Sequence, residues 1–203
     1  MIDKEHVVAE IKRTILVESQ AIARLNDVLD METVFKIVEL FASCKGRIIF
    51  SGCGTSAMGA KKIVHSLNCI ERPAVFLTPS DAVHGGLGVL QKGDILVLVS
   101  KGGNTGELVK LIPACKTKGA FLIGVTENPE SAIGKNADIC LKVGVEKEPC
   151  RFNMLATAST MAVVSVFDAI CIALMQYTGY TREQFAVIHP SGAVGERLLG
   201  GKE

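Results

Sequence analysis

The chain contains no tryptophan, and its 203 residues include only ten aromatic side chains, eight phenylalanines and two tyrosines. Proteins that bind single-stranded nucleic acid need aromatic side chains on which bases stack. A strong basic balance is missing as well, because 22 lysines and arginines stand against 21 acidic residues, and the basic residues are dispersed along the chain. A cationic stripe that would neutralise a phosphate backbone is therefore not expected. These two absences predict that nucleic acid is not a partner.

Export signals and paired cysteines are also lacking. The seven cysteines are an odd number, spread singly, and none forms a Cys-x-x-Cys pair, which predicts reduced thiols and no metal site. The N-terminal segment, residues 1–6, contains Asp3, Lys4 and Glu5, where a signal peptide would be apolar. The most apolar long stretch, Met161 to Met175, contains Asp168 and is shorter than the roughly 20 residues of a membrane span. We therefore expect a cytoplasmic protein with no membrane partner and read this stretch as a buried helix.

The residues that are present indicate one α/β domain over residues 1–203, since 48% are hydrophobic and 21% are charged. An apolar stripe predicts a long N-terminal helix over about residues 3–29, and helical patterns return over about 153–199. The core, about residues 46–145, alternates helical patterns with five apolar runs at 47–51, 74–78, 94–99, 120–125 and 138–143. This alternation predicts a doubly wound three-layer α/β/α sandwich with a five-stranded, mainly parallel sheet in flavodoxin-like order.

Two loops rich in glycine and hydroxyl groups each follow an apolar run and open a helical pattern. They are residues 51–56, Ser-Gly-Cys-Gly-Thr-Ser, and residues 100–105, Ser-Lys-Gly-Gly-Asn-Thr. Glycine permits a tight turn, and the helix that follows presents unpaired N–H groups to an anion. Either loop alone is equally well explained as a tight connection between a strand and a helix. Two such loops together favour a phosphorylated ligand held between neighbouring strand ends.

Two nucleotide-binding motifs are disfavoured by spacing. The first loop resembles a dinucleotide fingerprint, Gly52-x-Gly54-x-x-Ala57, but the acidic residue Asp81 follows Gly52 by 29 positions, later than a ribose ligand should. A nucleotide-hydrolysing P-loop needs a Gly-Lys-Ser/Thr end, and neither loop has one. Neither a dinucleotide site nor nucleotide hydrolysis is therefore expected.

Four acids and histidines lie near predicted strand ends. His84 follows the second apolar run, where an exposed turn explains it as well as function does. Glu107 lies three residues into a helix, where stabilisation of the helix dipole is the favoured explanation. Glu148 belongs to a charged segment that follows the fifth apolar run, where we expect it to face the same crevice as the two loops. His189 precedes Pro190 in a predicted turn. A carboxylate and an imidazole beside a sugar phosphate suit proton transfer between carbons.

Seven motifs together resemble the sugar isomerase (SIS) domain, and most closely the arabinose-5-phosphate isomerase subfamily of KpsF/GutQ-like proteins, over about residues 10–199. The motifs are residues 51–56, 79–88, 100–107, 145–150, 156–160, 179–181 and 189–195. The resemblance implies an aldose–ketose isomerase that interconverts ribulose 5-phosphate and arabinose 5-phosphate through an enediol, with no cofactor. It also implies a homodimer or homotetramer with shared active sites.

The same resemblance assigns roles to individual residues. Glu148 matches the candidate base, His189 matches an assisting histidine that comes from the same or a neighbouring subunit, and His84 and Glu107 match active-site positions. The phosphate and the rest of the substrate are assigned to Gly54, Thr55, Ser56, Ser100, Lys101, Gly103, Asn104, Thr105, Ser159 and Thr160.

The chain also departs from the subfamily pattern. The usual Gly-x-Gly-Lys-Ser has Thr55 in place of lysine, the usual His-Gly-Asp has Gly86 in place of aspartate, and a serine of the second loop is Gly102. Lys101 is a candidate to restore the missing charge from a different direction. Many relatives continue into a pair of CBS domains, which this sequence does not predict. Two alternatives stay open, a non-catalytic phosphosugar sensor and an isomerase of another sugar phosphate, such as a hexulose 6-phosphate.

Overall fold

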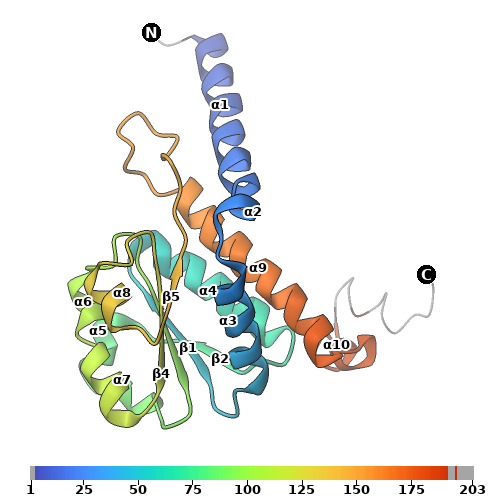
Figure 1. Ribbon diagram of the computed structural model, residues 1–203. Helices are drawn as coiled ribbons and strands as arrows, with labels where there is room; N and C mark the ends of the chain where they lie inside the picture. The colour runs from blue at the N-terminus through green and yellow to red at the C-terminus, as the bar shows by residue number, and fades with distance from the viewer. Residues whose placement is uncertain (1–2, 192–194, 196–203) are drawn as a thin grey trace.

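The computed structural model describes residues 3–191 and 195, and its centre is a five-stranded sheet (Figure 1). All neighbouring strands are parallel, in the order β2-β1-β3-β4-β5. The sheet confirms the predicted doubly wound fold and its flavodoxin-like order. The strands are β1 (Ile48–Gly52), β2 (Ala74–Phe76), β3 (Ile95–Val99), β4 (Phe121–Thr126) and β5 (Ile139–Lys142).

Both faces of the sheet are covered because successive strand residues point to opposite sides. Phe50 packs with Phe41 and Phe167 on one face, whereas its neighbour Ile49 belongs to the hydrophobic cluster of the other. On the Phe50 side lie α3 (Met31–Ser43), α4 (Gly54–Asn68) and α9 (Ala158–Thr178). On the Ile49 side lie α5 (Pro79–Ala82), α6 (Gly106–Val109), α7 (Ile112–Lys118) and α8 (Ala132–Asn136), with a 3₁₀ turn, η1 (Gly86–Val89), after α5.

The N-terminal region forms two helices where the sequence predicts one. α1 (Lys4–Ala23) begins at Asp3, whose carboxylate accepts a hydrogen bond from the backbone N–H of His6 at 2.8 Å, and α2 (Leu25–Val28) follows a break at Arg24. The break has a physical reason, since Leu25 turns into the core and is buried while α1 buries none of its residues. α1 contacts α9 and projects beyond the rest of the molecule (Figure 1).

The long apolar helix α9 extends beyond the apolar stretch 161–175 at both ends. Its 21 residues, with a mean hydropathy of 2.0 over the most apolar window, are long and apolar enough to cross a membrane by length and composition alone, a test that the core helix of a globular domain also passes. The helix packs against α1, α3 and α4, and Ala162, Val166 and Ile170 belong to the core, as expected for a core helix.

The chain continues from α9 into α10 (Arg182–Ile188). α10 begins with a capping box in which Thr181 and Gln184 satisfy each other's backbone N–H groups. Residues 192–194 and 196–199, which the sequence assigns to the last helices, lie outside the described residues.

Candidate active site

The two glycine-rich loops emerge side by side from the sheet. Ile48 of β1 pairs with Ile95 of β3, and the register continues to Gly52 and Val99, so the two strands end at the same level. From β1 the chain goes to β2 at one edge of the sheet, and it then returns to β3 on the other side of β1 and continues to β4 and β5 toward the opposite edge. The strand order therefore reverses at the boundary between β1 and β3. In open parallel sheets this boundary is where ligands bind.

The second loop, residues 100–105, is closed by its own side chains. The hydroxyls of Ser100 and Thr105 lie 2.8 Å apart, and the Gly103 N–H donates to the Ser100 hydroxyl at 3.1 Å. The Asn104 side-chain oxygen accepts the N–H of Ala132 in α8 at 2.9 Å. Ser100 is buried, so its hydroxyl serves the shape of the loop.

The first loop, residues 51–56, is open by contrast. Gly54 has φ +56° and starts the 15-residue helix α4, whose N-cap residue, Cys53, makes no side-chain capping bond. Among the described residues, none forms a hydrogen bond with the hydroxyl of Thr55 or Ser56. The first turn of α4 therefore presents free hydroxyls together with the unpaired N–H groups of a helix start.

Glu148 is a buried carboxylate with a full set of donors. Its Oε1 lies 2.8 Å from Nζ of Lys101 and accepts the Ser159 hydroxyl. Its Oε2 accepts the backbone N–H groups of Thr157 at 3.0 Å and Ser159 at 3.4 Å, where α9 begins. The residue is 2% exposed, so this carboxylate depends on these four donors in place of water.

The balance of burial and donors keeps Glu148 ionised. Burial alone would raise the pKa of its carboxyl, but the hydrogen bonds from Lys101, Ser159 and the two backbone N–H groups outweigh that effect and hold the pKa below its usual value. A carboxylate in this state accepts a proton and has none to give at neutral pH.

A small cavity of about 30 Å³ joins these groups. Its polar lining comes from four predicted residues, Ser56, Lys101, Ser159 and Thr160, together with Thr126, and its apolar lining comes from the strand ends and from α4 and α9. The structure thus brings the first loop, the second loop and the start of α9 to one crevice, beside Glu148.

Comparison with known protein families gives a match between residues 40–183 and the SIS domain. The chain belongs to the SIS domain family. The match covers the sheet, both loops and α9, which are the elements that build the crevice.

Curated relatives match over most of this chain. "Arabinose 5-phosphate isomerase KpsF" of Escherichia coli O6:H1 is 34% identical over 194 residues, 96% of this chain and 59% of the relative. "Arabinose 5-phosphate isomerase KdsD" of Pseudomonas aeruginosa is 39% identical over 192 residues, 93% of this chain and 57% of the relative. The chain therefore spans less than two thirds of the length of these SIS relatives.

Solved structures share the SIS fold along almost the whole chain. A putative sugar-phosphate isomerase from Listeria monocytogenes is 63% identical with a TM-score of 0.93, covering 94% of this chain and 100% of that one. An E. coli CFT073 protein solved in complex with arabinose 5-phosphate is 27% identical with a TM-score of 0.89, covering 93% and 100% of the two chains.

Two further predicted residues lie on the α5–α6 side of the sheet and do not line the small cavity. Glu107 is exposed in the first turn of α6. Burial raises the pKa of the Cys53 thiol in the first loop, and the nearby charge of Glu107 raises it further. His84 is exposed in the turn after α5, a helix that contacts α6. Neither side chain has a hydrogen bond to Glu148 among the described residues.

His189 lies far from Glu148 in the same chain. Its ring stacks on Phe185, with centroids 4.0 Å apart, and its Nδ1 lies 3.0 Å from the Phe185 carbonyl oxygen at the end of α10. Glu148 contacts the first turn of α9, whereas α10 follows its last turn (Figure 1). α9, which lies between them in the sequence, has 21 residues and is about 30 Å long at about 1.5 Å per residue.

Several residues that position the site were missed by sequence reasoning. Asn153, in the left-handed region with φ +54°, accepts the Glu148 N–H at 2.6 Å, and Thr126 donates its hydroxyl to the Lys101 carbonyl at 2.8 Å. Arg13 donates to the Pro149 carbonyl and Arg24 pairs with Glu146, so the N-terminal helices hold the Glu148 segment from outside. Of these residues, Thr126 could have been found from the sequence, because it is a polar residue directly after the apolar run 120–125.

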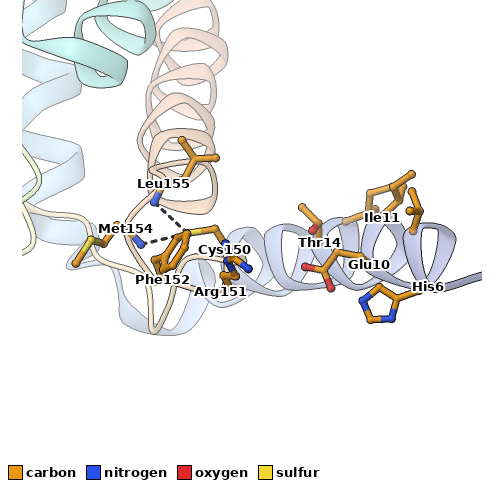
Figure 2. Close-up of a pocket in the computed structure, with 11 residues that line it drawn as sticks. His6, Glu10, Ile11, Thr14, Cys150, Arg151, Phe152, Met154 and Leu155 are labelled. Atoms are coloured by element: carbon orange, nitrogen blue, oxygen red, sulfur yellow. Dashed lines mark hydrogen bonds between the residues drawn. The ribbon is translucent and has the colours of Figure 1, made fainter. Parts of the chain in front are cut away.

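A larger cavity of about 1020 Å³ lies between α1 and residues 150–155 (Figure 2). Its wall is mainly apolar and exposed, with Ile11 and Phe152 more than half exposed. The backbone N–H groups of Leu155 and Met154 donate to Sγ of Cys150 at 3.1 and 3.2 Å and lower the pKa of that thiol (Figure 2). Among the described residues, no group of three or more His, Cys, Asp or Glu side chains is placed to hold a metal ion.

Proposed function

We propose that this chain is an aldose–ketose isomerase acting on a sugar phosphate, and that it interconverts arabinose 5-phosphate and ribulose 5-phosphate. The observation that carries the proposal is Glu148, a buried carboxylate kept ionised at a crevice that also presents free hydroxyls and a helix start. The substrate is supported by the names of the curated relatives and by the arabinose 5-phosphate complex of the E. coli neighbour.

The phosphate binds at the first turn of α4 in this proposal. The hydroxyls of Thr55 and Ser56 and the N–H groups after Gly54 are available to it, and Ser159 and Thr160 line the opposite wall. The second loop, through Ser100, Gly103, Asn104 and Thr105, holds the adjacent wall in shape. A helix start with hydroxyl donors stabilises a phosphate without a cation from the first loop.

Glu148 is the base that moves the proton. It removes the proton from C2 of the open-chain aldose, and the electron pair forms the C1=C2 bond of an enediolate while the carbonyl pair becomes negative charge on O1. The protonated Glu148 then returns the proton to C1, and the hydroxyl proton on O2 moves to O1, which leaves the ketone at C2. One carboxylate serves both carbons because they are adjacent.

His189 enters the site from a second copy of the chain in this proposal. Within one chain it is about 30 Å of helix away from Glu148. α1 buries none of its residues and exposes Val8, Ile11 and Ile15 on one face, an apolar surface of the kind that subunits cover. His84, in the turn after α5, and Glu107, in α6, are assigned to the sugar hydroxyls.

The reaction is assigned to the cytoplasm. All seven cysteines are free thiols, and Cys115 and Cys171 are buried. Free thiols suit a compartment that glutathione keeps reducing.

The test uses the purified chain with ribulose 5-phosphate, and NMR detects arabinose 5-phosphate. Glu148→Gln keeps the size of the side chain and removes the base, so the rate should fall by about 10² to 10⁴-fold. Glu130→Gln is the matched control, because Glu130 is an exposed carboxylate paired with Lys135 and should leave the rate unchanged. Equal turnover by wild type and Glu148→Gln would remove the assigned base.

A non-catalytic phosphosugar sensor is the second candidate, favoured by the observation that the first loop carries Thr55 in place of a cation. Calorimetry with arabinose 5-phosphate and a hexulose 6-phosphate, beside turnover assays of the same compounds, separates the two functions. Tight binding without isomerisation of any compound supports the sensor, and turnover of the hexulose alone reassigns the substrate.

The shared site has its own test. Light scattering should give a dimer or a tetramer. Glu148→Gln and His189→Gln chains, each impaired alone, should recover part of the activity when they are mixed and allowed to exchange subunits. A monomer with full activity contradicts this arrangement.

A further inference from the structure

Among the described residues that line the small cavity, Lys101 is the one with a charged side chain. Its side chain is 36% exposed while the side chain of its partner Glu148 is 0% exposed. The ammonium group is therefore the outer member of the pair, between the buried carboxylate and the open side of the site.

The backbone of Lys101 is fixed while its side chain has one strong contact. Its carbonyl oxygen accepts the Thr126 hydroxyl at 2.8 Å and the Glu127 N–H at 2.9 Å. The ammonium has one hydrogen bond among the described residues, to Glu148 at 2.8 Å. A lysine stem is flexible, so the charge can move several ångströms without any movement of the loop.

Glu148 does not need Lys101 to remain paired. When the ammonium leaves, the Ser159 hydroxyl still donates to Oε1, and the N–H groups of Thr157 and Ser159 still donate to Oε2. The carboxylate then keeps three donors but loses the cationic one. A carboxylate in that state binds a proton more strongly, as a base must.

We propose that Lys101 is the mobile cation of this site, which pairs with Glu148 when the site is empty and moves to the sugar oxygen O1 when substrate binds. The proposal rests on the proposed function. As Glu148 removes the C2 proton, negative charge appears on O1, and the ammonium stabilises it through a charge-assisted hydrogen bond without giving up its own proton. One movement thus strengthens the base and stabilises the enediolate.

The two loops differ in charge. Residues 51–56 of the first loop contain no charged side chain, whereas the second loop, after the neighbouring strand, contributes Lys101. The ammonium group of Lys101 thus reaches the crevice from the β3 side of the β1–β3 boundary, opposite the first loop, which follows β1.

The experiment compares Lys101→Met and Lys101→Arg with wild type in the isomerase assay across pH. Lys101→Met should lower kcat by about 10² to 10³-fold. Without the cation the pKa of Glu148 rises, so the acid limb of the kcat/KM profile should move to higher pH. Lys101→Arg keeps the charge and should keep the acid limb in place. Lys110→Met, at an exposed lysine that ends α6, is the matched control and should behave as wild type.

A rescue variant separates charge from structure. Lys101→Met combined with Thr55→Lys returns a cation to the crevice from the first loop and should regain at least tenfold in kcat over Lys101→Met alone. Circular dichroism melting identifies a variant that fails to fold, in which case Lys101→Gln is used instead.

A direct readout follows the Glu148 carboxyl by carbon NMR in wild type. Binding of 5-phosphoarabinonate, whose C1 carboxylate holds negative charge where O1 would develop it, should raise the pKa of Glu148 more in wild type than in Lys101→Met. The ligand charge acts in both proteins, but only wild type loses an ammonium partner. An unchanged kcat and acid limb in Lys101→Met, or an equal rise of the pKa in the two proteins, overturns the mobile cation and leaves the isomerase standing. An inactive wild type overturns the isomerase itself.

Discussion

The first glycine-rich loop, residues 51–56, and the second, residues 100–105, leave adjacent parallel strands at the same level, and they use their polar groups in opposite ways. In the second loop the hydroxyls of Ser100 and Thr105 bond to each other, and Gly103 is enclosed. In the first loop the hydroxyls of Thr55 and Ser56 bond to no described residue. Similar composition therefore gives two different structures, a loop closed by its own side chains and a loop with free donors, to which we assigned the phosphate.

The difference also shows how one crevice combines rigidity with access. The hydroxyl of Thr126, at the end of β4, and the N–H of Glu127 hold the backbone carbonyl of Lys101 in the second loop and so fix the point from which its side chain extends. The first loop keeps donors unpaired, and unpaired donors are what a phosphate requires. Four substitutions, taken in order of expected effect, test this division.

The largest effect is expected at Gly103. Its φ is +70°, and an added Cβ would lie 1.9 Å from Oγ of Ser131 and 2.8 Å from Oγ1 of Thr126. Gly103→Ala combines left-handed strain with overpacking and should lower the free energy of unfolding by about 3 kcal/mol, measured by urea titration. Gly102→Ala, where an added Cβ meets no atom within 4 Å, is the control and should change stability by about 0.5 kcal/mol or less. Equal losses would mean that the second loop is not held by this contact.

The next effect is expected at Ser100. Ser100→Ala removes the partner of the Thr105 hydroxyl and one acceptor of the Gly103 N–H, so unfolding should become easier by about 1.5 kcal/mol. The double variant Ser100→Ala with Thr105→Val should cost less than the sum of the single changes, because neither hydroxyl is then left without its partner. Additive losses in thermal and urea unfolding would contradict the bond between the two side chains.

The sequence predicts the architecture well, because each apolar run and each helical period reports the burial of its own residues. The runs at 47–51 and 94–99 become β1 and β3, and parallel strands bring the loops after them to one edge. The same reasoning predicts the position of Glu148, because a residue that follows the fifth parallel strand lies at the same edge of the sheet as the two loops. The break at Arg24 was missed because the apolar stripe continues through it, while the burial of Leu25 depends on the packed core.

Side-chain pairing is what the sequence leaves undetermined. The Ser100 and Thr105 hydroxyls suit a phosphate and each other equally well by composition, and only the folded loop places them 2.8 Å apart. Asn153 and Arg13 reach the Glu148 segment from positions with no motif. The distance of His189 from Glu148 depends on the length and direction of α9, which place α10 at the far end of the helix.

A smaller effect is expected at Gly54, the glycine with positive φ in the first loop. Its φ is +56°, but an added Cβ meets no atom within 4 Å, so Gly54→Ala should cost only the left-handed strain of about 1 kcal/mol. Urea unfolding beside Gly103→Ala gives the comparison directly, since both positions share the strain and only Gly103 is enclosed. A loss at Gly54 as large as the loss at Gly103 would show that the first loop is as tightly packed as the second.

The smallest effect on stability, with a clear effect on binding, is expected at Ser56. Because no described residue bonds to its hydroxyl, Ser56→Ala should change the free energy of unfolding by about 0.5 kcal/mol or less. The same hydroxyl is assigned to the phosphate, and loss of a hydrogen bond to a charged group should weaken the binding of arabinose 5-phosphate by about tenfold in calorimetry. Ser100→Ala should show the reverse pattern, a loss of stability larger than the loss of affinity. If Ser56→Ala unfolds as easily as Ser100→Ala and binds sugar phosphate as wild type does, the first loop is structural and the anion site must lie elsewhere in the crevice.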